Sequence, residues 1–266
     1  MDQVTSDILA VAVGNTRSRW GLFRSGKMDG PGHVAPCSEP EAIVAGLFEL
    51  AERGDDPSAV IASVNDSVAD QIEDAVLGRG WARSRLFRIN RDLPIELDHS
   101  LGDLSTVGQD RLLNAIGAYA QAQQACVVVD VGTAVTVDFV DGKGTFHGGA
   151  IAPGARMMLG ALHEHTAALP HVEFAKLDLD AGPFGVDTSH AMLVGVYASI
   201  RGLVRHLAEQ YAAYYEAYPQ IIATGGDAAA LFDGDDLVER IVPDLQLIGI
   251  QGACARALAH QAGEQD

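Results

Sequence analysis

Two short segments of this sequence place small and polar residues directly after an apolar run. Gly14-Asn15-Thr16 follows residues 8–13, and Asp130–Thr133 follows residues 126–129. Glycine lets a bound group come close to backbone N–H groups because it has no Cβ, while asparagine and threonine add side-chain donors. The chemistry that these residue types allow at the end of a strand is phosphate binding.

The two segments differ in charge. Asp130 supplies a carboxylate that can hold a hard cation, whereas the matching position of the first segment is Ala12, and the charges nearby are those of Arg17 and Arg19. A third turn, Gly225-Gly226, follows another apolar run and suits a flat base or sugar. For each turn alone, a tight turn of purely structural value is the better interpretation. The presence of all three in one chain favours phosphate binding.

A fourth segment, Gly108–Arg111, reads GQDR and opens a predicted helix. One interpretation is that Asp110 only stabilises the helix N-terminus and that Arg111 is solvated. The other is that Asp110 acts as general base for a hydroxyl while Arg111 binds an anionic group of the substrate.

The elements that must position these segments occur in a repeated order. Strands are predicted at 8–13, 20–24, 59–63, 85–89, 126–129, 135–139, 220–223 and 245–248, and helices at 40–54, 66–77, 110–124, from 154, and at 190–215, 227–232 and 251–260. Such a repeat predicts a duplicated α/β chain. Residues 1–107 would carry the first phosphate turn. Residues 108–266 would carry the second phosphate turn and the adenosine turn, with a ligand cleft between the halves.

Composition narrows the choice of ligand. The formal net charge of −18 disfavours nucleic acids and membrane surfaces as partners. Cys37, Cys126 and Cys254 are far apart and predict reduced, buried thiols, and the N-terminal apolar run is too short for a signal peptide or a membrane span. We therefore expect a cytoplasmic protein that binds a small anionic ligand.

The order of these motifs resembles type III pantothenate kinase over nearly the whole chain. The resemblance rests on GNT, GQDR, DVGTAVTVDFVDGKGTFHGGAIAPG, DTSHAMLVGV and TGGD, in that order. It implies the duplicated actin-like ATPase (ribonuclease H-like) kinase fold. The implied reaction is ATP-dependent phosphorylation of pantothenate to 4'-phosphopantothenate, the first step of coenzyme A biosynthesis. It also implies Mg²⁺, a monovalent cation (K⁺ or NH₄⁺), and a homodimer whose site is shared across the interface.

The resemblance further implies a role for individual residues. Asp110 would be the catalytic base within the pantothenate-binding segment Gly108, Gln109, Asp110 and Arg111, and Thr188 would reach pantothenate bound by the partner subunit. Asp130 would ligate the monovalent cation. The implied ATP-binding residues are Ala12, Val13, Gly14, Asn15, Thr16, Arg17, Ser18, Arg19, Thr133, Gly225 and Gly226.

Ala12 departs from the family pattern, which has aspartate at that position. This departure supports an alternative: a catalytically weak or inactive relative that binds ligand and serves a regulatory role. A further alternative is another phosphotransferase or a phosphatase with a different acceptor. We favour the kinase because all four of these motif residues are retained: Asp110, Arg111, Asp130 and Thr133.

Overall fold

The computed structural model describes residues 7–178 and 182–263, and these form two compact units. The first unit contains the chain up to Gln121 together with the segment from Asp244 onward, and the second is Ala122–Pro243. Both units consist of a mixed β-sheet with helices.

The first unit has a sheet in the order β3-β2-β1-β5-β6, with β4 paired to β2. Central strand β1 runs antiparallel to β2 and parallel to β5. The strands are β1 (Ile8–Val13), β2 (Arg17–Arg24), β3 (Lys27–Met28), β4 (His33–Pro36), β5 (Ser58–Ser63) and β6 (Leu86–Arg88). The α-helices are α1 (Pro40–Ala51), α2 (Asp66–Gly78), α3 (Gln109–Ala122) and α7 (Leu245–Gly263), with 3-10 helices at Arg83–Arg85 and Leu104–Thr106.

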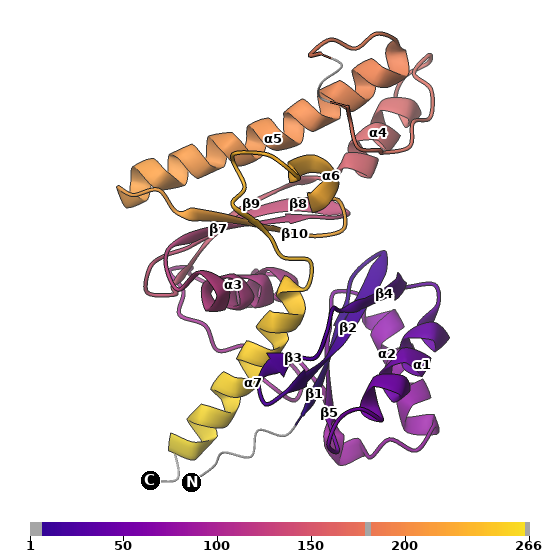
Figure 1. Cartoon of the computed structure of the whole chain (residues 1–266), viewed down its shortest axis with the longest axis vertical. Helices are drawn as coiled ribbons and strands as arrows, with labels where there is room; N and C mark the ends of the chain where they lie inside the picture. Colours follow the sequence, from indigo (N-terminus) through magenta and orange to yellow (C-terminus); the bar gives the residue numbers. More distant parts are fainter. Residues whose placement is uncertain (1–6, 179–181, 264–266) are drawn as a thin grey trace. The chain divides into compact units, whose positions relative to one another are not determined.

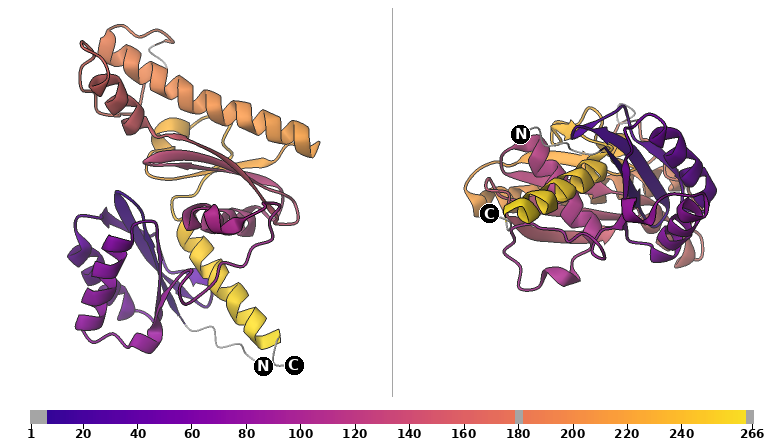
Figure 2. Two further views of the ribbon diagram at one scale, coloured as in Figure 1. Left: turned by 180° about the vertical axis from the view of Figure 1, so that it is seen from behind. Right: turned by 90° about the horizontal axis from the view of Figure 1, so that it is seen from below.

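The two faces of this first sheet are covered by different helices. Alternate residues of β1, such as Leu9 and Val11, pack with Ile43 of α1 and Ile72 of α2 in one buried cluster. Helix α7 contacts β1 and β2, and Figures 1 and 2 show it on the sheet face opposite α1 and α2. Because successive side chains of a strand point to opposite faces, Ala10 and Ala12 lie on the α7 side.

The second unit has a sheet in the order β11-β10-β7-β8-β9. Its long helix α5 packs Val196, Ile200 and Val204 against Val127 and Val129 of β7, and Figure 1 shows this helix running along the sheet. The strands are β7 (Cys126–Val131), β8 (Ala134–Val140), β9 (Phe146–Pro153), β10 (Gln220–Thr224) and β11 (Arg240–Ile241). The helices are α4 (Ala155–Glu164), α5 (Thr188–Tyr215) and α6 (Ala228–Phe232).

The two sheets share one topology, so the predicted duplication is confirmed. In each sheet a central strand pairs antiparallel with the strand that follows it and parallel with a later strand, which pairs parallel with an edge strand. The register also matches at the turns. Ala12 pairs with Arg19, and Asp130 pairs with Thr136, each one residue before the central strand ends.

Two features of the C-terminal segment differ from the sequence interpretation. The strand predicted at 245–248 is wrong, because these residues form the first turn of α7. A four-residue apolar run fits a strand or a buried helix equally, and here Leu245 and Leu247 are fully buried. The predicted division after residue 107 also differs from the compact units, since α7 returns to the first unit, where Gly249 packs directly on the carbonyl of Leu113.

A charged network joins α2 to the end of β6. The buried Arg88 guanidinium bonds Asp66, Asp70 and Glu73 of α2 at 3.0, 2.8 and 3.4 Å. Arg91 donates two further hydrogen bonds to Glu73, at 2.9 and 3.0 Å. The hydrogen bonds from Arg91 hold the pKa of the Glu73 carboxyl below its ordinary value.

Stability is expected to fall when this network is protonated. Because the folded-state pKa of Glu73 is lowered, its contribution is present above the unfolded pKa of about 4.3 and is lost as pH falls through the folded value. Glu73→Gln should lower the free energy of unfolding by roughly 1.5–3 kcal/mol at pH 7 and by much less at pH 3, measured by urea unfolding. Glu41→Gln, which breaks an exposed pair with Arg79, is the control and should change it by less than about 1 kcal/mol. An equal loss for Glu73→Gln at both pH values would contradict the assignment.

Candidate active site

The first turn that the sequence predicts to bind phosphate, hereafter the first phosphate turn, is Gly14–Thr16 between β1 and β2. The amide of Gly14 donates to the carbonyl of Arg17 at 3.1 Å, and an ideal Cβ on Gly14 would lie 2.7 Å from that same oxygen. Glycine is therefore required where the turn closes. Asn15, Thr16 and Arg17 are exposed, so the tip of the turn is open to a ligand.

The flanking residues predicted to bind ATP lie in a different environment. Ala12, Val13 and Ser18 are 3, 0 and 0 % exposed. Arg19 is half-buried, and its guanidinium bonds the carboxylate of Asp244 at 2.9 Å. Of the residues predicted to bind ATP in this segment, Gly14–Arg17 are therefore accessible to a ligand. The buried residues on either side pack inside the unit and hold the turn.

The structure brings the GQDR segment to the same edge of the first sheet. The side-chain amide of Gln109 donates to the carbonyl of Ser63, the last residue of β5. The next amide, that of Val64, donates to the carbonyl of Val13 at 3.0 Å. Since β1 and β5 are parallel neighbours, the N-terminus of α3 lies next to the strand end from which the Gly14 turn begins.

Asp110 lies in the first turn of α3 and is half-buried. Its Oδ1 accepts a hydrogen bond from the amide of Arg111 at 2.9 Å. An ideal Cβ on Gly108 would lie 2.5 Å from this same oxygen. Gly108 therefore leaves the space in which the Asp110 carboxylate lies, and the amide holds that carboxylate in place. This hydrogen bond fits the helix-stabilising interpretation and equally positions a general base.

The second phosphate turn lies between β7 and β8. Gly132 donates to the carbonyl of Ala134 at 2.9 Å, and Gly154 donates to that of Thr133 at 3.0 Å. A Cβ on Gly154 would overlap the carbonyl oxygens of both Gly132 and Thr133. The segment after β9 is thus packed directly under this turn and fixes it, while Thr133 remains exposed.

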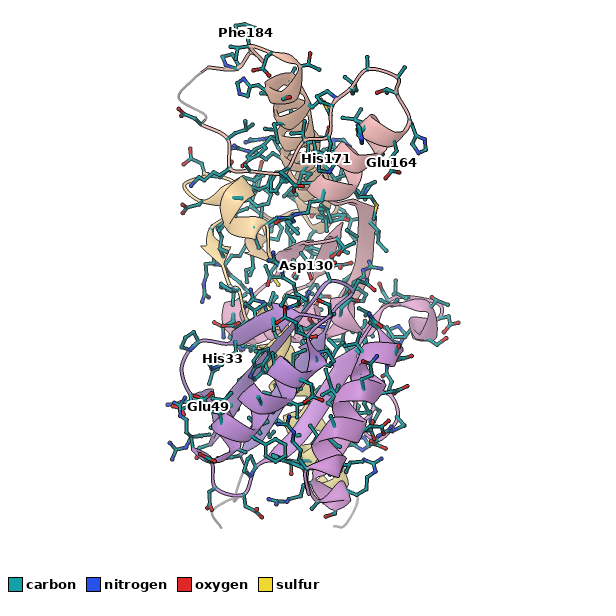
Figure 3. All side chains as sticks on the ribbon, turned by 90° about the vertical axis from the view of Figure 1, so that its right-hand side faces the viewer. His33, Glu49, Asp130, Glu164, His171 and Phe184 are labelled. Atoms are coloured by element: carbon teal, nitrogen blue, oxygen red, sulfur yellow. The ribbon has the colours of Figure 1, made fainter. Side chains whose placement is uncertain are left out.

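The predicted adenosine turn meets the second phosphate turn. Gly225 has a φ of +95°, and an ideal Cβ there would lie 2.5 Å from Oδ1 of Asp130 and closer still to the carbonyl oxygen of Val131. The following Asp227 donates its amide to that carbonyl at 3.1 Å. Asp130, labelled in Figure 3, therefore lies directly beside the Gly225 turn.

Sequence reasoning missed two residues that hold these turns. Arg156 of α4 bonds the buried carboxylate of Asp227 at 2.5 Å and lies over the ring of Phe174. Asp244 bonds Arg19 and also accepts from the amide of Gly32 at 3.0 Å. Asp227 belongs to the quoted TGGD motif, but its partner lies 71 residues away, and no local pattern reveals such a pair.

Thr188 is the first residue of α5 and is exposed. The preceding Asp187 caps the helix by accepting from the amide of His190 at 2.8 Å. Just before it, the large apolar side chains of Phe184 and Val186 are 80 and 81 % exposed. Figure 3 shows Phe184 far from Asp130, so this end of α5 is remote from the second phosphate turn of its own unit.

Two features are absent from the part of the chain that the structure describes. Within residues 7–178 and 182–263, no three histidine, cysteine, aspartate or glutamate side chains gather into a metal-binding cluster. Within the same residues, no helix combines the length and the apolar character that crossing a membrane requires.

Comparisons with known proteins indicate the family of this chain. Residues 8–210 match the family model described as type III pantothenate kinase. The type III pantothenate kinase of Rhodospirillum rubrum is 30 % identical over 91 % of this chain and 96 % of its own length, and that of Dehalococcoides mccartyi strain CBDB1 is 29 % identical over 93 and 95 %.

A solved structure supports the fold. A Campylobacter jejuni protein described as a Baf family transcriptional activator superposes with a TM-score of 0.61, at 18 % identity, over 94 % of this chain and 99 % of its own. Together with the duplicated sheet topology, this confirms the two-lobed, actin-like kinase fold. The predicted ligand cleft between the halves stays a prediction. From the family match, the relatives that span almost its whole length and the shared motif order, this chain belongs to the type III pantothenate kinase family.

Proposed function

We propose that this chain transfers the γ-phosphate of ATP to the terminal hydroxyl of pantothenate, giving 4'-phosphopantothenate for coenzyme A biosynthesis. The observation that carries the proposal is the contact between Gln109 and the end of β5. It places a carboxylate-bearing helix N-terminus beside a glycine turn that is open to phosphate. A phosphotransferase needs this combination, because its catalysis rests on positioning and on stabilising charge.

In this proposal two residues of GQDR act on different groups of pantothenate. Asp110 accepts the proton of the attacking hydroxyl, and its carboxylate is already oriented by the Arg111 amide. The Arg111 guanidinium binds the pantothenate carboxylate, for which its planar donors are suited. Gly14–Arg17 and Thr133 hold the phosphates, while Gly225 and Gly226 lie against the adenosine.

The proposed divalent cation is Mg²⁺ that accompanies ATP. Mg²⁺ keeps several waters and needs only one or two protein carboxylates besides the phosphates. When bound, it supplies charge neutralisation on the transferring phosphate. Ala12 contributes no oxygen ligand to it.

We assign the proposed monovalent cation, K⁺ or NH₄⁺, to Asp130. An ideal Cβ on Gly225 would lie 2.5 Å from Oδ1 of Asp130 and closer still to the carbonyl oxygen of Val131, so the Gly225 turn packs directly against the Asp130 carboxylate. A carboxylate oxygen is a donor suited to a hard cation. Asp130 would therefore serve as a ligand of that cation, beside the phosphate turn.

We also propose a homodimer in which Thr188 reaches the pantothenate site of the partner subunit. The exposed Phe184 and Val186 beside Thr188 support this proposal, since exposed apolar side chains next to one another often mark an interface.

A cytoplasmic location is proposed as well. It is supported by three free, buried cysteines, and burial raises the pKa of the Cys126 and Cys254 thiols to about 12.

The test is ADP release with ATP and Mg²⁺, with and without pantothenate, in K⁺ and again in Na⁺. The wild type should turn over only with pantothenate and faster in K⁺. Ala12→Asp should raise kcat about tenfold, which is about 1.4 kcal/mol, because it adds a carboxylate at the metal site. Ala12→Asn is the control, since it has nearly the same shape without the charge.

The outcomes distinguish the proposed kinase from the two alternatives, a ligand-binding relative and an enzyme with a different acceptor. If the wild type is inactive and only Ala12→Asp turns over, the natural chain is the ligand-binding relative, for which Ala12 is the supporting observation. Turnover with other alcohols but not with pantothenate would indicate a different acceptor. Equal activity of Ala12→Asp, Ala12→Asn and the wild type would remove position 12 from metal binding.

A further inference from the structure

Cys37 donates two hydrogen bonds to backbone carbonyls of the first phosphate turn. It follows β4, is 8 % exposed, and donates its backbone amide to the carbonyl of Thr16 at 2.9 Å. Its thiol donates to the carbonyl of Gly14 at 3.2 Å. Cys37 therefore holds two of the three carbonyl groups in the turn Gly14–Thr16.

The thiol is itself held by a buried hydroxyl. Ser18 Oγ lies 3.3 Å from Cys37 Sγ, and Ser18 is fully buried. A thiol has one proton. Since the Cys37 proton is given to the Gly14 carbonyl, the Ser18 hydroxyl donates to the sulfur. The resulting chain, Ser18 to Cys37 to Gly14, fixes the thiol in one orientation.

These hydrogen bonds determine which way a backbone amide of the turn points. In a planar trans peptide the C=O and the following N–H point in opposite directions. Because Cys37 holds the Gly14 carbonyl on its own side, the N–H of Asn15 is directed away from Cys37. Asn15 is exposed, and an N–H group on the open side of a turn is a donor for an anion.

We propose that Cys37 is a positioning residue for nucleotide binding, acting through the Gly14–Asn15 peptide. Without the thiol, that peptide loses its side-chain anchor and the Asn15 amide is no longer fixed toward the phosphates. The inference rests on the proposed role of Gly14–Thr16 in ATP binding and adds a residue outside those motifs. It involves no covalent step, and Cys37 does not touch the substrate.

The test compares Cys37→Ala, Cys37→Ser and Cys254→Ala. Serine retains a hydroxyl donor at position 37, whereas alanine removes it. Cys254 of α7 lies in the same unit, is equally buried at 5 % exposure, and is distant in sequence from the turn, so its alanine variant controls for a lost buried thiol. Measured for each protein are KM for ATP and for pantothenate, Kd for Mg²⁺-ADP by calorimetry, and Tm.

Cys37→Ala should raise KM for ATP and Kd for ADP about threefold to tenfold, the range for one lost hydrogen bond, with KM for pantothenate unchanged. Cys37→Ser should stay within about twofold of the wild type in both. Cys254→Ala should lower Tm as Cys37→Ala does and leave nucleotide affinity unchanged. The proposal is overturned if Cys37→Ala binds nucleotide as tightly as the wild type does. It is also overturned if Cys254→Ala loses as much nucleotide affinity as Cys37→Ala.

The ADP measurement separates this inference from the proposed reaction. If the wild type binds ADP but shows no pantothenate-dependent turnover, the proposed reaction fails while Kd still decides the role of Cys37. If the wild type binds no Mg²⁺-ADP, both are overturned.

Discussion

Asp110→Asn is expected to lower kcat about 10²- to 10⁴-fold, the range for loss of a general base. Asparagine can still accept the hydrogen bond that the Arg111 amide now gives to Asp110, so the helix N-terminus should remain formed. The side-chain amide of the introduced asparagine cannot take a proton from the pantothenate hydroxyl at neutral pH. Steady-state ADP release measures kcat, and circular dichroism checks the fold.

The matched control for this variant is Asp103→Asn. Asp103 also accepts a hydrogen bond from a backbone amide at the start of a short helix, that of Ser105 at 2.9 Å, and it precedes the GQDR segment. Its variant makes the same change of charge and shape, and kcat should stay within about twofold. Unchanged turnover in Asp110→Asn would remove Asp110 from the mechanism and leave only its role at the helix terminus.

The sequence alone was sufficient to predict the repeated parts of the fold. β1, β7 and β10 are apolar runs followed by glycine turns, and α2 has the predicted helical period. These features depend on neighbouring residues, so a single sequence reveals them. The helix that begins with GQDR is predicted from neighbouring residues as well. The structure places Asp110 in its first turn.

The contacts that organise the site could not be predicted in this way. Arg19 meets Asp244 across 225 positions, and the thiol of Cys37 reaches Gly14 because β4 pairs with β2. The sequence predicts a reduced, buried thiol at Cys37, and its low exposure confirms the burial. Its hydrogen bonds to the turn depend on sheet register, and no spacing in the sequence encodes them.

Gly225→Ala is expected to destabilise the protein by roughly 2–6 kcal/mol and to raise KM for ATP. Two costs add here: a φ of +95°, which L residues rarely adopt, and a Cβ that would collide with Oδ1 of Asp130 and the carbonyl of Val131. The collision displaces the proposed cation ligand, so activation by K⁺ should weaken as well. Urea unfolding and ATP titrations in K⁺ and Na⁺ measure these effects.

Gly234→Ala separates the two costs of the Gly225 substitution. Gly234 lies in the same unit with a φ of +78°, but a Cβ there would meet nothing within 4 Å. It should therefore show only the backbone cost, about 1–2 kcal/mol, and leave KM for ATP and the response to K⁺ unchanged. If both variants lose the same stability and Gly225→Ala keeps its K⁺ response, then Asp130 is not a ligand of the cation. A larger loss at Gly225 together with a weakened K⁺ response would support Asp130 as a ligand of the cation, because of the two variants only Gly225→Ala adds a methyl group that meets the Asp130 carboxylate.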